Sequence, residues 1–169
     1  MSPRFFAAAP ALSGLFASWL AAVAPTPAAA QDAEREPATV TAPLAVTWAA
    51  VQRLVRDDPN NGRLDLLEEG AGLRRGRWQL MIPSSDFRAG EWAACRTGVE
   101  AAYAPRQGMV DVVVRGDSAS STILVSARWS AEDPSQPQTA TVCVTRGRYE
   151  SDAEKAVKTR AEREAKRNR

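Results

Sequence analysis

A stretch of alternating residues between Met109 and Trp129 constrains the fold most strongly. Apolar side chains occupy every second position on both sides of a polar turn that begins at Gly116. A period of two is the spacing of a β-strand with one buried face, so the stretch predicts two antiparallel strands joined as a hairpin. A further apolar run at 139–145 predicts the next strand of the same sheet.

Two further segments have the pattern of helices that cover one face of such a sheet. After a short strand predicted at 38–42, Pro43 precedes apolar residues at helical spacing, and a Pro-Asn-Asn-Gly sequence ends that helix. The second helix is predicted to begin at Ser151, because its spacing from Glu154 is that of a capping box. The expected fold class is α+β: an antiparallel sheet with an N-terminal amphipathic helix and a C-terminal helix packed on it, in a helix-grip-like arrangement.

The first 30 residues have the composition of a secretory signal. One basic residue, Arg4, precedes a long uncharged apolar stretch, and small residues stand before Gln31. We expect cleavage between Ala30 and Gln31, after which no transmembrane span is expected and the protein would be periplasmic or secreted. An uncleaved anchor is the alternative, because the apolar run approaches the roughly 20 residues that span a bilayer. The expected organisation is a signal peptide at 1–30, a flexible leader at 31–37, one α+β domain at 38–157 and a basic helical tail at 158–169.

The composition argues against several kinds of chemistry. The chain has 22 basic and 20 acidic residues and no histidine. This nearly balanced net charge does not produce the positive electrostatic potential that attracts nucleic acid. Without histidine, two cysteines are too few ligands for a standard zinc site. Ser118 in the hairpin turn lacks the histidine that usually acts as the general base for a serine nucleophile. We expect no catalytic residues, no metal and no cofactor, and hence not an enzyme. An enzyme that relies on arginine and carboxylates alone is the alternative.

The two cysteines, Cys95 and Cys143, are expected to form a disulfide, since an exported protein folds in an oxidising compartment. The bond would close a loop of about 49 residues and stabilise the fold by about 4 kcal/mol on the chain-entropy model. Two separate buried thiols are the alternative.

The segment 84–108 is the least regular part of the expected domain. It has turn-forming residues at both ends and no sustained periodicity. Long irregular segments in compact domains often form binding loops. If the protein has a binding site, we expect it here and at the facing end of the first helix.

Tryptophans and the basic C-terminus supply the candidate contact residues. Each tryptophan is compatible with two roles, a core anchor or a platform on which a ligand stacks. These tryptophans are Trp48, Trp78, Trp92 and Trp129. The tail has a surplus of positive charge that is either solvated or contacts an anionic surface. Its candidate residues are Lys158, Arg160, Arg163, Lys166, Arg167 and Arg169.

The sequence Thr39-Val40-Thr41-Ala42-Pro43-Leu44, followed by Trp48 and Leu54, resembles the opening of the START-like, or polyketide cyclase, superfamily. That opening is a strand, an Ala-Pro turn and a helix bearing a tryptophan. The resemblance covers 16 residues. It implies a helix-grip fold with a ligand cavity between the sheet and the final helix.

The segments 91–98 (EWAACRTG) and 143–150 (CVTRGRYE), together with the opening that contains Trp48, resemble those of a family of small bacterial envelope proteins, periplasmic or lipoprotein-like. In that family a central cysteine segment and a late Cys-x-Ser/Thr-x-Gly segment flank the strands. The resemblance implies an envelope location and a Cys95–Cys143 bridge. No catalytic residues are attached to the pattern, so none carry over.

These observations favour an exported envelope protein whose domain binds or scaffolds another component without catalysis. The expected partner is an envelope protein or an anionic lipid surface, and not nucleic acid. The alternative is a helix-grip carrier of a small apolar ligand or lipid. An apolar cavity of roughly 300 Å³ or more under the sheet would favour the carrier, whereas a filled core would exclude it.

Overall fold

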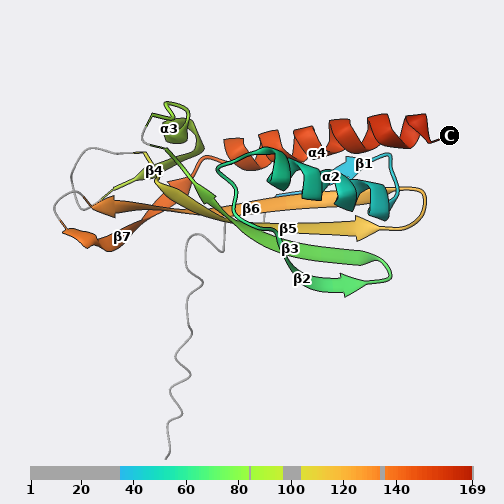
Figure 1. Cartoon of the computed structure of the whole chain (residues 1–169), viewed down its shortest axis with the longest axis horizontal. Helices are drawn as coiled ribbons and strands as arrows, with labels where there is room; N and C mark the ends of the chain where they lie inside the picture. The colour runs from blue at the N-terminus through green and yellow to red at the C-terminus, as the bar shows by residue number, and fades with distance from the viewer. Residues whose placement is uncertain (1–34, 84, 97–103, 134–135, 169) are drawn as a thin grey trace, which may run out of the picture.

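The computed structural model describes residues 35–83, 85–96, 104–133 and 136–168. A long antiparallel sheet carries two helices on one face, as Figure 1 shows. The protein is an α+β domain with an N-terminal and a C-terminal helix on the sheet, which confirms the expected fold class. The predicted signal peptide at 1–30, with its cleavage site, and Arg169 lie outside the described residues.

The sheet is built around the predicted hairpin. Its strands are β1 (Ala38–Val40), β2 (Asp65–Gly70), β3 (Leu73–Met81), β4 (Ala93–Cys95), β5 (Gln107–Gly116), β6 (Ser121–Asp133) and β7 (Gln136–Thr145). Their order is β2-β3-β5-β6-β7-β4, with β1 also paired to β6, and these pairings are antiparallel. β5 and β6 form the hairpin, and Val112 lies opposite Val125 at its centre. Alternate residues of both strands are buried, as the period of two predicts.

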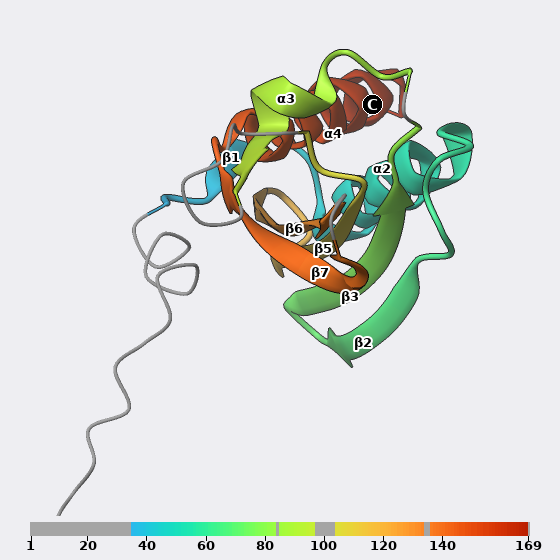
Figure 2. The ribbon, with the colours of Figure 1, turned by 90° about the vertical axis from the view of Figure 1, so that its left-hand side faces the viewer.

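Helices α2 (Leu44–Asp57) and α4 (Arg148–Arg167) pack against each other on the sheet. Figure 2 shows the strands curving around the pair. α2 begins directly after Pro43, as predicted, and the backbone N–H of Leu44 donates to the Asp117 carbonyl oxygen in the hairpin turn at 2.9 Å. A short helix, α3 (Ala89–Trp92), lies beside the start of α4 (Figure 1).

The start of α4 differs from the prediction. The helix begins at Arg148, directly after Gly147, whose φ of 72° is a left-handed conformation that suits glycine. The backbone N–H of Ser151 donates to the Gly147 carbonyl oxygen at 3.1 Å, so Ser151 lies in the first turn and not at the cap. The carboxylate of Glu154 contacts β6 instead of the helix start. The capping-box prediction is therefore wrong.

The last part of α4 is not a separate tail. The predicted boundary at 158 falls inside a continuous helix, and Ala161 and Ala165 are buried beyond it. Arg160 forms an ion pair with Asp57 of α2 at 2.9 Å. The buried face of this part of the helix consists of alanines and not of large apolar residues. The hydropathy pattern of the sequence therefore did not indicate that it is buried. Small side chains allow two helices to approach closely, so this end of α4 belongs to the packed domain.

Two glycines of the sheet make room for buried tryptophans. A Cβ atom at Gly76 would lie 2.8 Å from Cη2 of Trp48, and one at Gly108 would lie 2.6 Å from Cζ3 of Trp129. Both distances are well below the roughly 3.5 Å at which carbon atoms pack. The indole rings therefore lie directly on the backbone of β3 and β5. Together with buried Trp78 they fill the core between sheet and helices.

Side chains bridge a gap between β1 and β7 on one edge of β6. β1 pairs with the first residues of β6 and β7 with the last, so Val125 between them has no strand partner on that side. The Val125 N–H donates to Glu154 Oε1 at 2.9 Å, and its carbonyl oxygen accepts from Arg35 Nη1 at 2.8 Å. Arg35 also pairs with Glu154 at 3.1 Å. The N-terminal segment is thus fastened to both β6 and α4.

Glu154 is expected to make stability depend on pH. Burial raises the pKa of this carboxyl above its ordinary value of 4.5, although the Val125 N–H and the Arg35 charge act in the opposite direction. The folded state then binds more protons than the unfolded chain between pH 4.5 and the folded pKa, so this contribution falls as pH rises through that interval. In urea unfolding from about pH 4 to about pH 8, wild type should lose stability relative to Glu154→Gln as pH rises. Parallel pH curves for the two proteins would contradict this.

Candidate functional site

An open-sided cavity of about 320 Å³ lies at the end of the sheet where α4 begins. It is bounded by the end of α2 and the following turn, the end of β3, the segment that contains α3, and the first turns of α4. Its lining residues are Leu54, Asp58, Asn60, Asn61, Leu80, Met81, Ile82, Pro83, Asp86, Arg88, Glu91, Trp92, Arg148, Tyr149, Asp152, Ala153 and Ala156. Residues of the irregular segment and of the facing end of the first helix thus line the same cavity.

The inner wall of the cavity is apolar and rests on the filled core. Leu80 and Ile82 contribute from β3 and the residues after it, and Leu54 contributes from α2. Buried Trp78 does not line the cavity, but its Nε1 donates to Asn61 Oδ1 at 3.1 Å. This bond fixes the turn after α2 against the sheet. The apolar wall is therefore rigidly placed beside polar groups of that turn.

Charged side chains form the rim of the cavity. They are four carboxylates and two guanidiniums: Asp58, Asp86, Glu91, Asp152, Arg88 and Arg148. Arg148 lies 3.3 Å from Glu91 and 4.0 Å from Asp152, and Arg88 lies 3.5 Å from Asp86. The rim therefore has a net negative charge, because four carboxylates outnumber two guanidiniums. Each of the two arginines already pairs with at least one carboxylate.

Among the described residues, Asp58 is the rim carboxylate that has no ion-pair partner. Its Oδ1 accepts the backbone N–H of Asn60 at 2.9 Å, and it forms no ion pair within the described parts of the chain. The neighbouring Asp57 points to α4 and pairs with Arg160. The turn that carries Asp58 is held to β3, because the Met81 N–H donates to the Asn60 carbonyl oxygen at 2.9 Å. Asp58 is thus placed at the cavity by backbone contacts.

Two aromatic rings form one side of the cavity. Tyr149 packs edge-on against Trp92 with their centroids 5.3 Å apart, and the guanidinium of Arg88 lies 5.8 Å from the centroid of Trp92. Burial raises the pKa of Tyr149 far above its usual range, and the negative charges of Asp58 and Glu150 raise it further. Tyr149 is therefore a neutral phenol at physiological pH. The Trp92 ring already holds a cation over its face.

A buried polar group lies behind these rings. Trp129 Nε1 donates to Thr145 Oγ1 at 3.3 Å, and Thr145 Oγ1 donates to Glu150 Oε1 at 2.7 Å. Glu150 Oε2 is buried and has no hydrogen-bond partner among the residues that the structure describes. Glu150 does not line the cavity, so this group supports the aromatic wall from the core side.

The four candidate tryptophans have different positions. Trp48, Trp78 and Trp129 are buried in the core, and none of them lines the cavity. Trp92 is half-buried and lines it. The core interpretation therefore holds for three of the four, and the ligand-platform interpretation stays open for Trp92 alone.

The candidate basic residues do not form one continuous free surface. Arg160 is half-buried against Asp57, Lys158 lies 3.9 Å from Glu162, and Arg167 lies 4.0 Å from Glu164. Arg163 and Lys166 are exposed. Three of the five candidates that the structure describes thus have intramolecular partners, which the net charge of the segment did not reveal.

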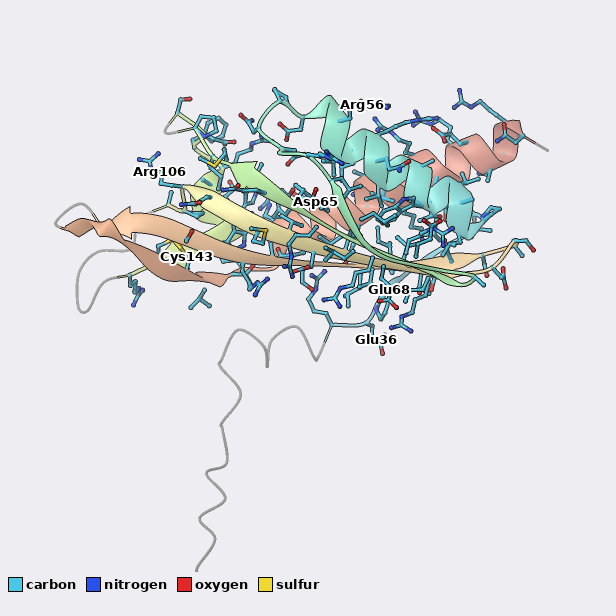
Figure 3. All side chains as sticks on the ribbon, turned by 60° about the horizontal axis from the view of Figure 1, so that its bottom comes forward. Glu36, Arg56, Asp65, Glu68, Arg106 and Cys143 are labelled. Carbon is cyan, nitrogen blue, oxygen red and sulfur yellow. A yellow bond between two sulfur atoms is a disulfide. The ribbon has the colours of Figure 1, made fainter. Side chains whose placement is uncertain are left out.

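Cys95 and Cys143 form a disulfide between β4 and β7. The two residues lie directly opposite each other in the strand register, with Cα atoms 4.0 Å apart. Figure 3 labels Cys143 near the end of the sheet. Because β4 follows α3 without a break, the bond also ties the Trp92 side of the cavity to β7.

Two residues of the site were not identified as candidates from the sequence. In the sequence, Asp58 has the pattern of an ordinary polar residue at the end of a helix, and Tyr149 that of an apolar residue of a helix stripe. The Asn-rich turn directly after Asp58 is a sequence signal for an ordered turn, and it could have indicated that this carboxylate has a fixed position. No comparable signal marks Tyr149, whose position depends on where α4 begins.

Neither a membrane-spanning helix nor a metal-binding cluster is found among the described residues. None of the helices there has the length and apolar character that crossing a membrane requires. In the same residues, no group of three or more histidine, cysteine, aspartate or glutamate side chains is arranged to hold a metal ion.

Comparison with known proteins identifies one similar solved structure. The crystal structure of the Zhui aromatase/cyclase from Streptomyces sp. R1128 is similar to this chain at 18% sequence identity, with a TM-score of 0.32. The similarity covers 76% of this chain and 92% of the other. No protein-family model and no curated protein matches the sequence. The resemblance to small envelope proteins therefore has no support beyond the sequence segments that carry it.

Proposed function

We propose that this protein is an exported binding domain that holds a small, partly apolar molecule in the cavity between α2, α3 and α4. The observation that carries the proposal is the cavity itself, about 320 Å³ with an apolar inner wall and a polar rim. Small-molecule sites are concave and mostly apolar, with a few polar groups that orient the ligand. The cavity combines both kinds of group. Binding without catalysis is part of the proposal.

The volume and position of the cavity favour a compact ligand over a lipid. Its volume is near the lower end of the roughly 300–1,000 Å³ typical of ligand sites. The space deeper under the sheet is filled by Trp48, Trp78 and Trp129, so a long acyl chain has no room to enter. The ligand we propose therefore lies at the end of the helix pair and not along its length.

Export to an oxidising compartment is the second part of the proposal. It is supported by the basic and apolar start of the chain and by the Cys95–Cys143 disulfide. Disulfides persist mainly outside the reducing cytosol. A binding domain in that location would meet small molecules of the periplasm or the medium.

A cavity-blocking variant tests the proposed site. Ala156 lines the cavity from α4 but is exposed, so Ala156→Trp should fill the space without disturbing the core. Fragments that raise the melting temperature of wild type should bind this variant at least about tenfold more weakly. Thr159→Trp is the matched control, since Thr159 is exposed further along the same helix and does not line the cavity.

The measurement is a thermal-shift screen of a fragment library, followed by calorimetric titration of each hit against the three proteins. Equal affinity for wild type and Ala156→Trp would place the hits elsewhere and contradict the proposal. A screen that yields no hit at about millimolar concentration would contradict it as well.

A further inference from the structure

We propose that the molecule held in this cavity carries a positively charged amine, seated between the Asp58 carboxylate and the Trp92 and Tyr149 rings, with an apolar body against Leu80 and Ile82. This inference rests on the proposed function, and it names the chemical class of the ligand.

The charge of the rim is the first argument. Arg88 and Arg148 are engaged with Asp86, Glu91 and Asp152, whereas Asp58 has no basic partner among the described residues. A cation is attracted by the net negative rim and finds one carboxylate free of competition. An anionic ligand must instead break an existing ion pair before it meets a free guanidinium.

The aromatic wall is the second argument, and it is independent of the carboxylates. The face of Trp92 already has the guanidinium of Arg88 at 5.8 Å from its centroid, within the roughly 6 Å range of a cation–π contact. Arg88 is an exposed side chain on a short connecting segment. A ligand ammonium can therefore take its place over the ring. Tyr149, a neutral phenol whose ring centroid lies 5.3 Å from that of Trp92, lines the same cavity.

The inner wall strengthens both contacts. Leu80 and Ile82 are buried and line the cavity, so the side of the ligand that faces them leaves water. Charge attraction is stronger beside a low-dielectric surface than in bulk water. The same wall holds an apolar group by the hydrophobic effect. A compact amine with an apolar or aromatic body satisfies all three parts of the cavity.

The test compares three probes with the same aromatic body and different charge: 2-phenylethylammonium, 2-phenylethanol and 3-phenylpropanoate. Calorimetric titration of the purified protein should show the ammonium binding at least about tenfold more tightly than the alcohol, with the propanoate weakest. The preference for the ammonium over the alcohol should shrink as salt concentration rises.

Two variants assign the preference to Asp58. Asp58→Asn keeps the oxygen that accepts the Asn60 N–H but removes the charge, so it should lower the ammonium affinity about tenfold and leave the alcohol affinity unchanged. Asp57→Asn is the control for net charge, because Asp57 pairs with Arg160 and not with the cavity. This variant should leave the preference for the ammonium probe intact. Melting temperatures of both variants verify that they are folded.

The outcomes separate this inference from the proposed function. Equal binding of ammonium and alcohol, or tightest binding of the propanoate, would overturn the charge assignment while leaving a binding cavity in place. An unchanged ammonium preference in Asp58→Asn would overturn the role of Asp58. Failure of all three probes, together with an empty fragment screen, would remove the binding function itself.

Discussion

Replacing Trp129 with alanine is expected to lower the free energy of unfolding by about 3 to 5 kcal/mol, the usual cost of emptying a large buried site. Trp129 is buried opposite Gly108, and its centroid lies 5.7 Å from that of Trp92 and 5.2 Å from that of Tyr149. Truncation leaves a cavity and removes the indole N–H from Thr145 Oγ1. Typical domains have only about 5 to 15 kcal/mol of stability, so the variant should be close to unfolding.

Urea unfolding followed by circular dichroism measures this loss directly. The matched control is Arg128→Ala, one residue earlier on β6 and on the opposite, exposed face. Arg128 pairs with Asp111 at 3.2 Å, and loss of an exposed pair should change stability by no more than about 1 kcal/mol. If Trp129→Ala cost as little as the control, the indole would not be a core anchor.

Reduction of the Cys95–Cys143 disulfide is expected to lower the free energy of unfolding by a similar amount, about 4 kcal/mol on the chain-entropy model. Loss of a native disulfide from other small domains typically costs about 2 to 5 kcal/mol. The two cysteines are separated by 48 positions, so the bond restricts a long loop of the unfolded chain. It also anchors β4, a strand of three residues that follows α3 and the Trp92 wall. Ligand affinity at the cavity should therefore fall together with stability.

The comparison is wild type with and without dithiothreitol against the Cys95→Ser/Cys143→Ser double variant. Reduced wild type should match the double variant, and the double variant should be insensitive to the reductant. Thiol alkylation verifies that reduction is complete. Equal stability of oxidised and fully reduced wild type would show that the bond contributes nothing to the fold.

The parts of the fold that depend on local periodicity were predictable from the sequence. β5 and β6 each bury one face, so their apolar residues alternate, and the hairpin follows from the pattern alone. α2 was predictable because Pro43 marks its start and its apolar residues recur at helical spacing. β2 is exposed along nearly its whole length and carries a much weaker signal.

The parts that depend on tertiary contacts were not predictable. Ser151 and Glu154 have the spacing of a helix cap, but Glu154 contacts Val125 because β1 and β7 leave that stretch of β6 unpaired. The residues next to Ser151 and Glu154 in the sequence give no sign that part of β6 lacks a strand partner. The end of α4 was missed for a related reason, since Ala161 and Ala165 become core residues only when α2 lies beside them.

The candidate site was predictable in place but not in composition. Irregular sequence indicated the segment around α3 and the facing end of α2, and the cavity lies there. The chemistry that we propose for it depends on Asp58, Trp92 and Tyr149, which are far apart in the chain. Only the sheet order and the true start of α4 bring them together.

The most direct test of the central claim, that this cavity is a ligand site, is an amide-resolved NMR titration of the isotope-labelled protein with 2-phenylethylammonium. We predict saturable shifts confined to residues around Asp58, the end of β3, α3 and the first turns of α4. The hairpin turn at Asp117 and the outer face of the sheet should remain unshifted. Shifts centred on those distant surfaces, or no saturable shift anywhere, would contradict the account.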